Sequence, residues 1–420
     1  MKKIAVIGAG ISGLSAAQML KSHNAVTVYE KESQPGGLIK CRRVNGSLFH
    51  TCGGHVFNSK RQDVLNWFWD RFSRDDEFSK TDRNSTVFMG DGRVIPYPIE
   101  NHIYLFDKKT QKAFYEDLDE IDRVKGAHAK FTDYNNFGEF LRWRFGKTLY
   151  NIYFQPYNEK VWRRDLTTVP MSWMEDKLPM PTTQEMRENN ANKVKEKAFV
   201  HSTFWYEKQN GSQHIADRMA EGLDIRYGVD IQQMKYNGGQ WVIEDEYFDK
   251  VVFCGNIKDM VKSVHGIDLT VFGPDVDALE YHGTTAVFCE IDKNPFSWIY
   301  QPSRNHESHR IICTGNFAPS NNDKSIPSDR ITATIEFTDY ISIEGILDNL
   351  SRIPLHPKYL SHQYNQFTYP IQDKNTREMI KSLKAALAPF SFFFTGRFAD
   401  WEYYNMDVAI GAAMDLCKTI

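Results

Sequence analysis

The sequence predicts an α/β protein with three parts: a doubly wound parallel sheet, an inserted helical domain, and a mixed or antiparallel sheet. An apolar strand at residues 3–7 that runs into a glycine-rich turn and an apolar helix predicts the first part. Residues 102–197 are charged and helical in pattern, which predicts the second. Alternating apolar residues within 241–337 predict the third. A chain of 420 residues is long enough for two or three domains.

The glycine-rich turn has the spacing of a dinucleotide-binding motif. Its first glycine permits a tight turn, its second lets the backbone approach a pyrophosphate, and its third lets the helix pack close to the strand. The start of the helix then offers free N–H groups to the phosphates. A second strand at 25–29 ends at an acidic residue, where the motif places the ligand of the ribose hydroxyls. These predicted adenine-dinucleotide contacts are Gly8, Gly10, Ile11, Ser12, Gly13 and Glu30.

The segment that follows Glu30 favours FAD over NAD. It contains a second pair of glycines, Gly36 and Gly37, shortly after the acidic residue. This pattern resembles the extended fingerprint of FAD-binding proteins of the glutathione reductase and amine oxidase type. The resemblance adds Lys31, Gly36, Gly37 and Leu38 to the predicted cofactor contacts.

Composition excludes several classes of function. The net charge of −3 gives no basic surplus for nucleic acid, so no nucleic-acid partner is expected. No run of about 18 apolar residues is present, so no transmembrane segment is expected. The first strand begins at Lys2 and leaves no room for a signal peptide, which predicts a cytoplasmic protein. Six scattered cysteines without a C-x-x-C pair predict neither a metal site nor a redox dithiol.

Local patterns place further elements along the chain. Apolar residues at helical spacing predict a helix within 59–72, and glycines at 90 and 92 predict a hairpin between two short strands. A turn at 209–211 opens another helix, and a buried strand is expected at 391–394. A final helix near Asp407 would direct its N–H groups at an electron-rich acceptor such as a flavin ring. An ordinary capped terminal helix fits the same pattern.

These elements predict domain boundaries. The Rossmann-type FAD-binding domain is expected to be discontinuous and to comprise residues 1–78, 200–260 and 385–420. The helical domain is expected at 100–198. The substrate-domain sheet is expected at 79–99 and 261–384.

Five blocks in chain order resemble UDP-galactopyranose mutase and its relatives within the flavin amine oxidase and protoporphyrinogen oxidase superfamily. The blocks lie at residues 49–57, 96–99, 153–162, 367–371 and 396–407. The resemblance implies further FAD contacts at Gly54, His55, Val229, Asp230, Ile231, Gly396, Arg397, Asn405, Met406 and Asp407. It implies an active site at His55, Tyr157, Trp162, Tyr369 and Tyr404, although buried core packing could also account for these aromatic residues.

The match is weakest at the cations that hold the substrate diphosphate. One arginine of the family follows a Leu-Pro pair, and here Leu178 and Pro179 are followed by Met180 and Pro181. The other lies on a strand of the substrate domain, where this chain carries Asp339. An acid or a proline does not replace a bidentate phosphate donor. The candidates to compensate are Arg163, Arg164, Lys177 and Arg377.

The residues leave three classes open. The first is a mutase-like isomerase that uses reduced flavin on a sugar nucleotide or related precursor of surface polysaccharide, with no net oxidation. The second is an FAD-dependent oxidoreductase of the amine oxidase, protoporphyrinogen oxidase or desaturase type. The third is a flavin-binding protein without catalysis. The expected partners are a small-molecule substrate and a reductant such as NAD(P)H, and a homo-oligomer is left open.

Overall fold

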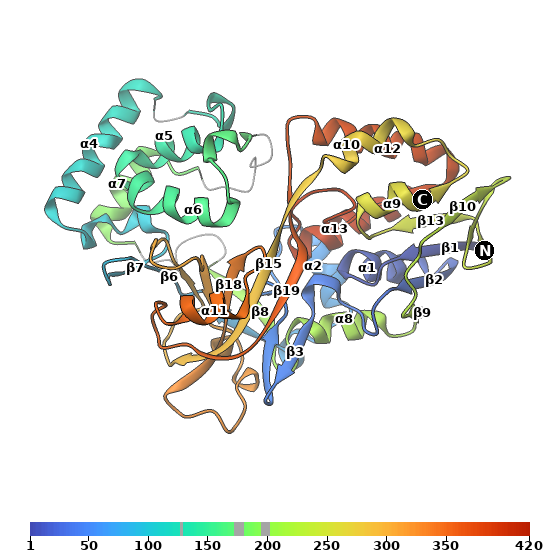
Figure 1. Ribbon diagram of the computed structural model, residues 1–420, viewed down its shortest axis with the longest axis horizontal. Helices are drawn as coiled ribbons and strands as arrows, with labels where there is room; N and C mark the ends of the chain where they lie inside the picture. Colours follow the sequence, from blue (N-terminus) through green and yellow to red (C-terminus); the bar gives the residue numbers. More distant parts are fainter. Residues whose placement is uncertain (127–128, 172–179, 195–201) are drawn as a thin grey trace.

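The computed structural model describes residues 1–126, 129–171, 180–194 and 202–420. Figure 1 shows the helical insertion at upper left, the larger sheet below it, and the parallel sheet at right beside both ends of the chain. None of the helices within the described ranges is both long and apolar enough to cross a membrane.

A five-stranded parallel sheet confirms the predicted doubly wound part of the α/β fold. Its strand order is β20, β13, β1, β2, β9, so the first strand of the chain lies at the centre. The strands come from distant parts of the chain: β1 (Lys2–Ile7), β2 (Asn24–Glu30), β9 (Asp224–Tyr227), β13 (Lys250–Phe253) and β20 (Phe392–Phe394).

Both faces of this sheet are buried, as parallel sheets require. Ile4 and Val6 of β1 face one apolar core, while Ala5 and Ile7 face another. The first core is covered by α1 (Ile11–Leu20), α2 (Gln62–Trp69), α8 (Ser212–Ala220) and α13 (Met406–Cys417). The second is covered by α9 (Ile257–Ser263), α10 (Gly273–Asp277) and α12 (Thr376–Leu387).

A seven-stranded mixed sheet lies within the segments expected to form the substrate domain. Its strand order is β19, β15, β18, β17, β16, β6, β7, and all neighbours are antiparallel except β6 and β16. The strands are β6 (Ser85–Phe88), β7 (Val94–Pro96), β15 (Glu280–Asp292), β16 (Trp298–Tyr300), β17 (Arg310–Ile312), β18 (Arg330–Thr338) and β19 (Lys358–Ile371). The hairpin predicted around residue 91 is β6 and β7. The long strands β15 and β19 run from this sheet towards the parallel sheet (Figure 1).

Smaller sheets complete the two domains. Four short strands pack beside the second core: β10 (Met234–Asn237), β11 (Gln240–Ile243), β12 (Glu246–Phe248) and β14 (Val264–His265). Two two-stranded ribbons pair β3 (Cys41–Val44) with β4 (Ser47–His50), and β5 (Phe78–Asp82) with β8 (Thr203–Glu207). Short helices α3 (Arg74–Glu77) and α11 (Ile343–Leu350) lie in the connections.

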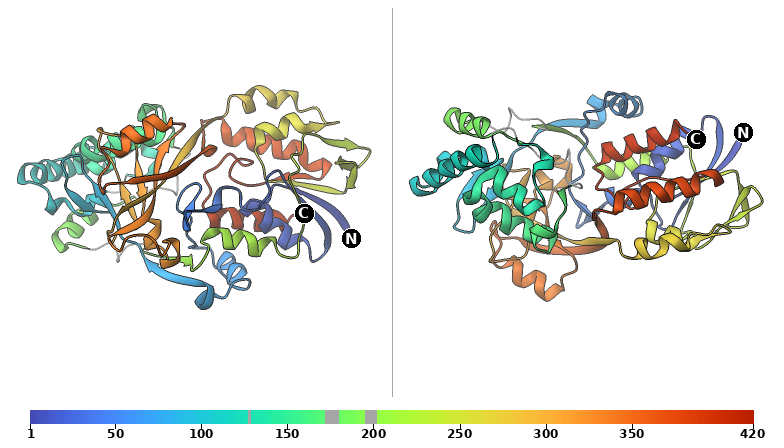
Figure 2. Two further views of the ribbon diagram at one scale, coloured as in Figure 1. Left: turned by 60° about the horizontal axis from the view of Figure 1, so that its bottom comes forward. Right: turned by 90° about the horizontal axis from the view of Figure 1, so that it is seen from above.

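The predicted helical insertion is present and has its own apolar core. It contains α4 (Lys108–Val124), α5 (Phe137–Leu149), a π-helical turn at Tyr150–Phe154, α6 (Gln155–Trp162) and α7 (Thr183–Asn192). Asp107 begins α4 by accepting the Thr110 N–H at 2.9 Å, a standard helix cap. Both views in Figure 2 place this insertion at the far end from the chain termini.

The core packing moves two of the expected domain boundaries. Helix α12 packs against the parallel sheet through Ile380, Leu383 and Leu387, although its residues fall within the segment 261–384 that was expected in the substrate domain. Val276 of α10 joins the same core. An amphipathic helix does not reveal which sheet its apolar face covers, so the sequence pattern alone could not assign these helices.

Candidate active site

The glycine-rich turn brings the start of α1 against the centre of the parallel sheet. A Cβ on Gly13 would lie 1.9 Å from the Gly8 carbonyl oxygen, so only glycine allows this approach of helix and strand. Helix α1 begins after Gly10 with no side-chain cap and with no acidic residue in its first turn. The N–H groups of the first turn, which include those of Ile11 and Ser12, are therefore left for an anion.

Glu30 lies at the end of β2, beside this turn. It is 7% exposed, and its carboxylate accepts the Ala9 N–H at 2.7 Å and the Glu32 N–H at 3.0 Å. Each oxygen keeps capacity to accept one more hydrogen bond, which suits a pair of ribose hydroxyls. The turn, the uncapped helix and this carboxylate fit the adenine end of a dinucleotide.

The second pair of glycines folds back onto the first motif. Gly36 donates its N–H to the Ala9 carbonyl at 2.8 Å, and a Cβ on Gly37 would lie 3.2 Å from the Gly10 Cα. Val229 donates to the Glu30 carbonyl at 3.0 Å, which brings the predicted segment 229–231 to the same edge. Leu38 follows Gly37 and is half-buried, whereas the Lys31 side chain is exposed.

A cavity of about 670 Å³ lies where the parallel sheet meets the larger sheet. Seven of the predicted site residues line it: Gly54, His55, Tyr369, Arg397, Asn405, Met406 and Asp407. Gly396 lies just outside, where a Cβ would come 3.2 Å from Ser12 Oγ. The N-terminus of α13 faces the cavity and has no side-chain cap from Asn405. The N-terminus of α13 therefore points at the cavity, as the sequence predicted.

His55 carries a buried polar atom that has no partner among the described residues. Its Nε2 makes no hydrogen bond, although the ring lines the cavity. Burial and the positive charge of Arg397 lower the pKa of His55 to about 4, so the ring is neutral at pH 7. A buried nitrogen that is left unsatisfied fits a site that is completed by a polar cofactor.

His50, which contacts His55, predicts acid-sensitive stability. Its ring is fully buried, and burial followed by repulsion from His55 lowers its pKa to about 3. In the unfolded chain His50 binds a proton below its ordinary pKa of about 6.5. In the folded chain the same ring stays neutral down to about pH 3. The free energy of unfolding should therefore fall as pH drops from 6.5 to 3, by about 1.4 kcal/mol per pH unit at most for this group.

The measurement is urea unfolding at several pH values for His50→Gln and for His23→Gln. His23 is exposed, so its variant should keep the acid dependence of the wild-type protein. The His50 variant should show a shallower slope between pH 6.5 and 4. Equal slopes in both variants would contradict this assignment.

A buried ion pair, absent from the predicted site, forms one wall of the cavity. Glu336 is 1% exposed and accepts Arg310 Nε at 2.7 Å, with a second short contact to Arg310 Nη2. Its other oxygen accepts the Gly53 N–H at 2.8 Å. Burial alone would raise the pKa of Glu336, but Arg310 and His309 hold it well below its ordinary value. The charge of Glu336 thus fixes both the guanidinium and the loop that carries His55.

Arg310 is one of the cations that line the cavity. Burial alone would lower its pKa, but Glu336 raises it well above the ordinary value, so the charge is permanent. Arg83 also lines the cavity and donates to Ser85 Oγ at 2.9 Å and to the Tyr300 hydroxyl at 2.8 Å. Neither arginine was predicted. Arg310 and the carboxylate that orients it lie on different strands, β17 and β18, so no local pattern connects them.

The three arginines among the four candidate cations of the sequence do not line this cavity. Arg163 donates to Glu307 and to the Thr338 carbonyl, each at 3.1 Å. Arg377 binds Glu402 and two backbone carbonyls, and Arg164 pairs with Glu280. Lys177, together with Leu178 and Pro179, lies outside the described residues. These arginines are engaged elsewhere, whereas Arg310 and Arg83 line the cavity.

Asp339, which stands where the family carries an arginine, is also engaged. Its carboxylate accepts His282 Nδ1 at 2.8 Å and the Gly283 N–H at 2.8 Å. His282 in turn donates from Nε2 to the Trp162 carbonyl at 2.7 Å. Asp339 therefore orients His282, and His282 connects β15 to the end of α6.

The predicted aromatic residues separate into two groups. The Tyr369 ring stacks on Tyr403 with 5.2 Å between ring centroids, and Arg397 lies 4.3 Å above the Tyr403 ring. Tyr404, in contrast, donates to Asp400 Oδ2 at 3.1 Å and does not line the cavity. The expectation that Tyr404 lies in the site is thus corrected by one position, because the loop before α13 turns Tyr403 inward.

Tyr157 and Trp162 lie behind the cavity wall. Tyr157 is stacked on Tyr153 and meets Tyr300 edge-on at 5.6 Å, and Tyr300 lines the cavity. Trp162 is 8% exposed and meets Tyr369 edge-on at 6.4 Å. Both contact residues that line the cavity without lining it themselves.

Tyr403→Leu and Tyr404→Phe form a matched pair of variants. We expect Tyr403→Leu to lower kcat/KM about tenfold, because it removes an aromatic pair and a cation–π contact. Tyr404→Phe should stay within about twofold of the wild-type value, since its hydroxyl contacts only Asp400 at the edge. Steady-state kinetics at equal flavin occupancy measure both values. If Tyr404→Phe lowered kcat/KM more than Tyr403→Leu did, Tyr404 would belong to the site and the present assignment of Tyr403 would be wrong.

The chain is similar to several known proteins. A model of the NAD(P)-binding Rossmann-like domain matches residues 6–72. UDP-galactopyranose mutase of Mycoplasma pneumoniae is 21% identical over 97% of this chain and 94% of its own length. Mitochondrial protoporphyrinogen oxidase of Nicotiana tabacum is 41% identical, but over only 15% of this chain and 12% of its own length.

The solved structure of reduced UDP-galactopyranose mutase has a TM-score of 0.85 and 20% identity, and the match covers all of this chain and 93% of that one. The match to the mutase extends over the helical insertion and the larger sheet. The chain therefore resembles UDP-galactopyranose mutase along nearly its whole length and has the fold of that enzyme.

Proposed function

We propose that this chain is an FAD-dependent enzyme that isomerises a sugar nucleotide, or a related precursor of surface polysaccharide, without net oxidation. The observation that carries this function is the Arg310–Glu336 pair in the wall of the cavity beside His55. A permanently charged guanidinium in the wall of a cavity suits a leaving diphosphate. The full-length likeness to UDP-galactopyranose mutase supports the same class of substrate.

The residues present fit FAD. The first turn of α1 would hold the pyrophosphate, Glu30 the ribose, and the segment 229–231 the adenine. His55, Arg397 and the start of α13 would contact the ring. Bound there, FAD would supply two-electron chemistry and, when reduced, a nucleophilic ring nitrogen.

The side chains of the cavity would perform the remaining work. Arg310 and Arg83 would bind the diphosphate. They would hold the diphosphate near the sugar after the bond between sugar and diphosphate breaks. Tyr369 and Tyr403 would pack against the sugar and exclude water. Neutral His55 would accept or donate a hydrogen bond at the ring edge without adding charge. The proposed setting is the cytoplasm, with a reductant such as NAD(P)H, and a homo-oligomer is compatible with it.

The test uses purified protein loaded with FAD and reduced anaerobically with dithionite. UDP- and dTDP-sugars are added, and the products are separated by chromatography while the flavin spectrum is recorded. The expected result is an isomerised sugar with the flavin still reduced. If no sugar changes, and candidate amines or porphyrinogens bleach oxidised flavin instead, the enzyme is an oxidoreductase. The matched control is the same protein with oxidised flavin, which should be inactive as an isomerase.

A further inference from the structure

The side chain of His282 lies behind the cavity wall, between β15 and the end of α6. It is buried and does not line the cavity beside His55. Its Nδ1 binds the Asp339 carboxylate at 2.8 Å, and its Nε2 binds the Trp162 carbonyl at 2.7 Å. The ring therefore connects the larger sheet to the helical insertion.

His282 is next to a residue that does line the cavity. In the antiparallel pair of β15 and β19, His282 is the register partner of Tyr369. Side chains at such positions lie on the same face of a sheet, with their Cβ atoms about 5 Å apart. Trp162, whose carbonyl His282 holds, meets the Tyr369 ring edge-on at 6.4 Å. His282 is thus linked to Tyr369 in two ways, across the sheet and through α6.

The backbone of His282 is also linked to the cavity. Thr368 donates its hydroxyl to the His282 carbonyl at 3.0 Å. The Thr368 carbonyl in turn accepts Arg397 Nη1 at 3.1 Å, and Arg397 lines the cavity. The segment around His282 therefore contacts the supports of two residues of the cavity wall.

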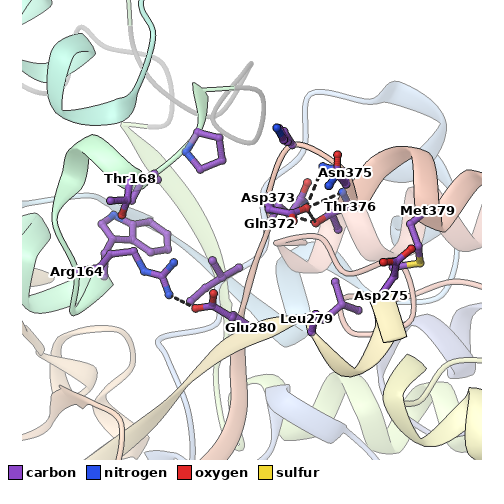
Figure 3. Close-up of a pocket in the computed structure, with 16 residues that line it drawn as sticks. Arg164, Thr168, Asp275, Leu279, Glu280, Gln372, Asp373, Asn375, Thr376 and Met379 are labelled. Carbon is purple, nitrogen blue, oxygen red and sulfur yellow. Dashed lines mark hydrogen bonds and ion pairs between the residues drawn. The ribbon is translucent and has the colours of Figure 1, made fainter. Parts of the chain in front are cut away.

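Packing fixes Trp162 on one side only. On the side away from Tyr369, the residue lines a second cavity of about 510 Å³. Figure 3 shows this cavity, with Arg164 and Glu280 paired at its edge. Glu280 is exposed, so this ion pair holds the end of α6 only weakly. The hydrogen bond from His282 to the Trp162 carbonyl is buried, which protects it from competing water.

Asp339 fixes the orientation of the His282 ring. Its other carboxylate oxygen accepts the Gly283 N–H at 2.8 Å, and its carbonyl accepts the Thr285 hydroxyl at 2.7 Å. Burial alone would raise the pKa of Asp339, but the hydrogen bonds from His282 and Gly283 lower it. Asp339 also has a φ of +63°, a conformation that costs about 1–3 kcal/mol and persists only when surrounding contacts hold it. These contacts make Asp339 a rigid support for the ring.

We infer that His282 is a positioning residue for the proposed reaction, and this inference rests on that function. It holds Trp162 against Tyr369, and so it fixes the ring that would pack against the sugar. Asp339 in turn fixes His282. The arginines that would bind the diphosphate are held by other contacts. The pair of His282 and Asp339 should therefore influence the chemical step more than the binding of substrate.

Steady-state kinetics separate this role from substrate binding. His282→Leu should lower kcat about tenfold and change KM less than about twofold, because a displaced Tyr369 affects the reacting sugar while the diphosphate contacts remain. Asp339→Gly should have the same effect, since glycine accepts the backbone angle but leaves the ring of His282 unsupported. The double variant should be no slower than either single variant, because the two residues act as one unit.

Asp339→Asn is the conservative variant and should keep kcat within about twofold of the wild-type value. Its amide oxygen can still accept the Gly283 N–H, which places its NH₂ group at His282 Nδ1. A neutral ring accepts from that amide and still donates to the Trp162 carbonyl. This variant therefore preserves the orientation of the ring without the charge of the carboxylate.

The indole N–H resonance of Trp162 gives a readout that needs no turnover. The FAD-loaded protein is prepared with isotope-labelled tryptophan, and Trp162→Phe assigns the signal. The signal should move in His282→Leu and Asp339→Gly, and stay in place in Asp339→Asn. His356→Asn is the matched control, because exposed His356 binds Asp292 at 2.6 Å at the other end of β15. Asparagine tolerates the positive φ of His356.

A moved indole signal together with a lower kcat and an unchanged KM supports the positioning role. An indole signal that stays in place in His282→Leu and Asp339→Gly overturns it. A raised KM at constant kcat also overturns it, as does an equal loss of kcat in Asp339→Asn and Asp339→Gly. If the wild-type protein isomerises no sugar, the proposed function fails, and the indole signal alone decides whether His282 positions Trp162. Thermal unfolding of each variant verifies that it is folded.

Discussion

Arg310→Met is expected to lower the free energy of unfolding by about 3–5 kcal/mol, because it leaves the Glu336 carboxylate buried without its partner. Glu336 is 1% exposed, so water cannot replace the guanidinium. The same variant should lower kcat/KM about 100-fold or more, since the cavity loses a permanently charged guanidinium that would bind the diphosphate. Urea unfolding and steady-state kinetics measure the two effects.

Two further variants separate the structural role of this pair from its role at the substrate. Arg310→Met combined with Glu336→Gln should recover most of the lost stability, because no unpaired charge remains and the amide oxygen still accepts the Gly53 N–H. It should not recover activity. Arg352→Met breaks the surface pair with Asp348 and should cost less than about 1 kcal/mol. A double variant with full activity would remove Arg310 from the diphosphate site.

Gly13→Ala is expected to abolish FAD binding. The added Cβ would lie 1.9 Å from the Gly8 carbonyl oxygen, so α1 and the glycine-rich turn must move apart. That movement displaces the N–H groups that face the pyrophosphate. The measurement is the ratio of flavin absorbance to protein absorbance after reconstitution with excess FAD, followed by gel filtration.

Gly273→Ala is the control for this substitution. A Cβ at Gly273 meets nothing within 4 Å, and its backbone angle is an ordinary one, so flavin occupancy should be unchanged. Normal flavin occupancy in Gly13→Ala would show that the helix does not need this close approach. Loss of flavin in both variants would show that the assay reports general instability instead.

The predicted helical insertion shows how far a pattern of residues can be read. Its helices follow from local periodicity and capping, as at Asp107, and the structure contains them. The assignment of α12 to a domain was wrong because its apolar face could cover either sheet, and only the packing of Leu383 and Leu387 decides which. Local patterns specify an element, whereas its neighbours are specified by the whole chain.

The sequence by itself determined the nucleotide-binding motif, since its strand, turn, helix and Glu30 lie within 30 consecutive residues and each has a local physical requirement. It also determined that His55, Tyr369 and Arg397 belong to one region, through the resemblance of short blocks. Only the tertiary structure decided that Tyr403 rather than Tyr404 faces the cavity, and that Arg310 lines it. Glu336, which orients Arg310, also binds Gly53, 283 positions away. Contacts at such separation depend on how the strands of the larger sheet pair, and no local pattern encodes that pairing.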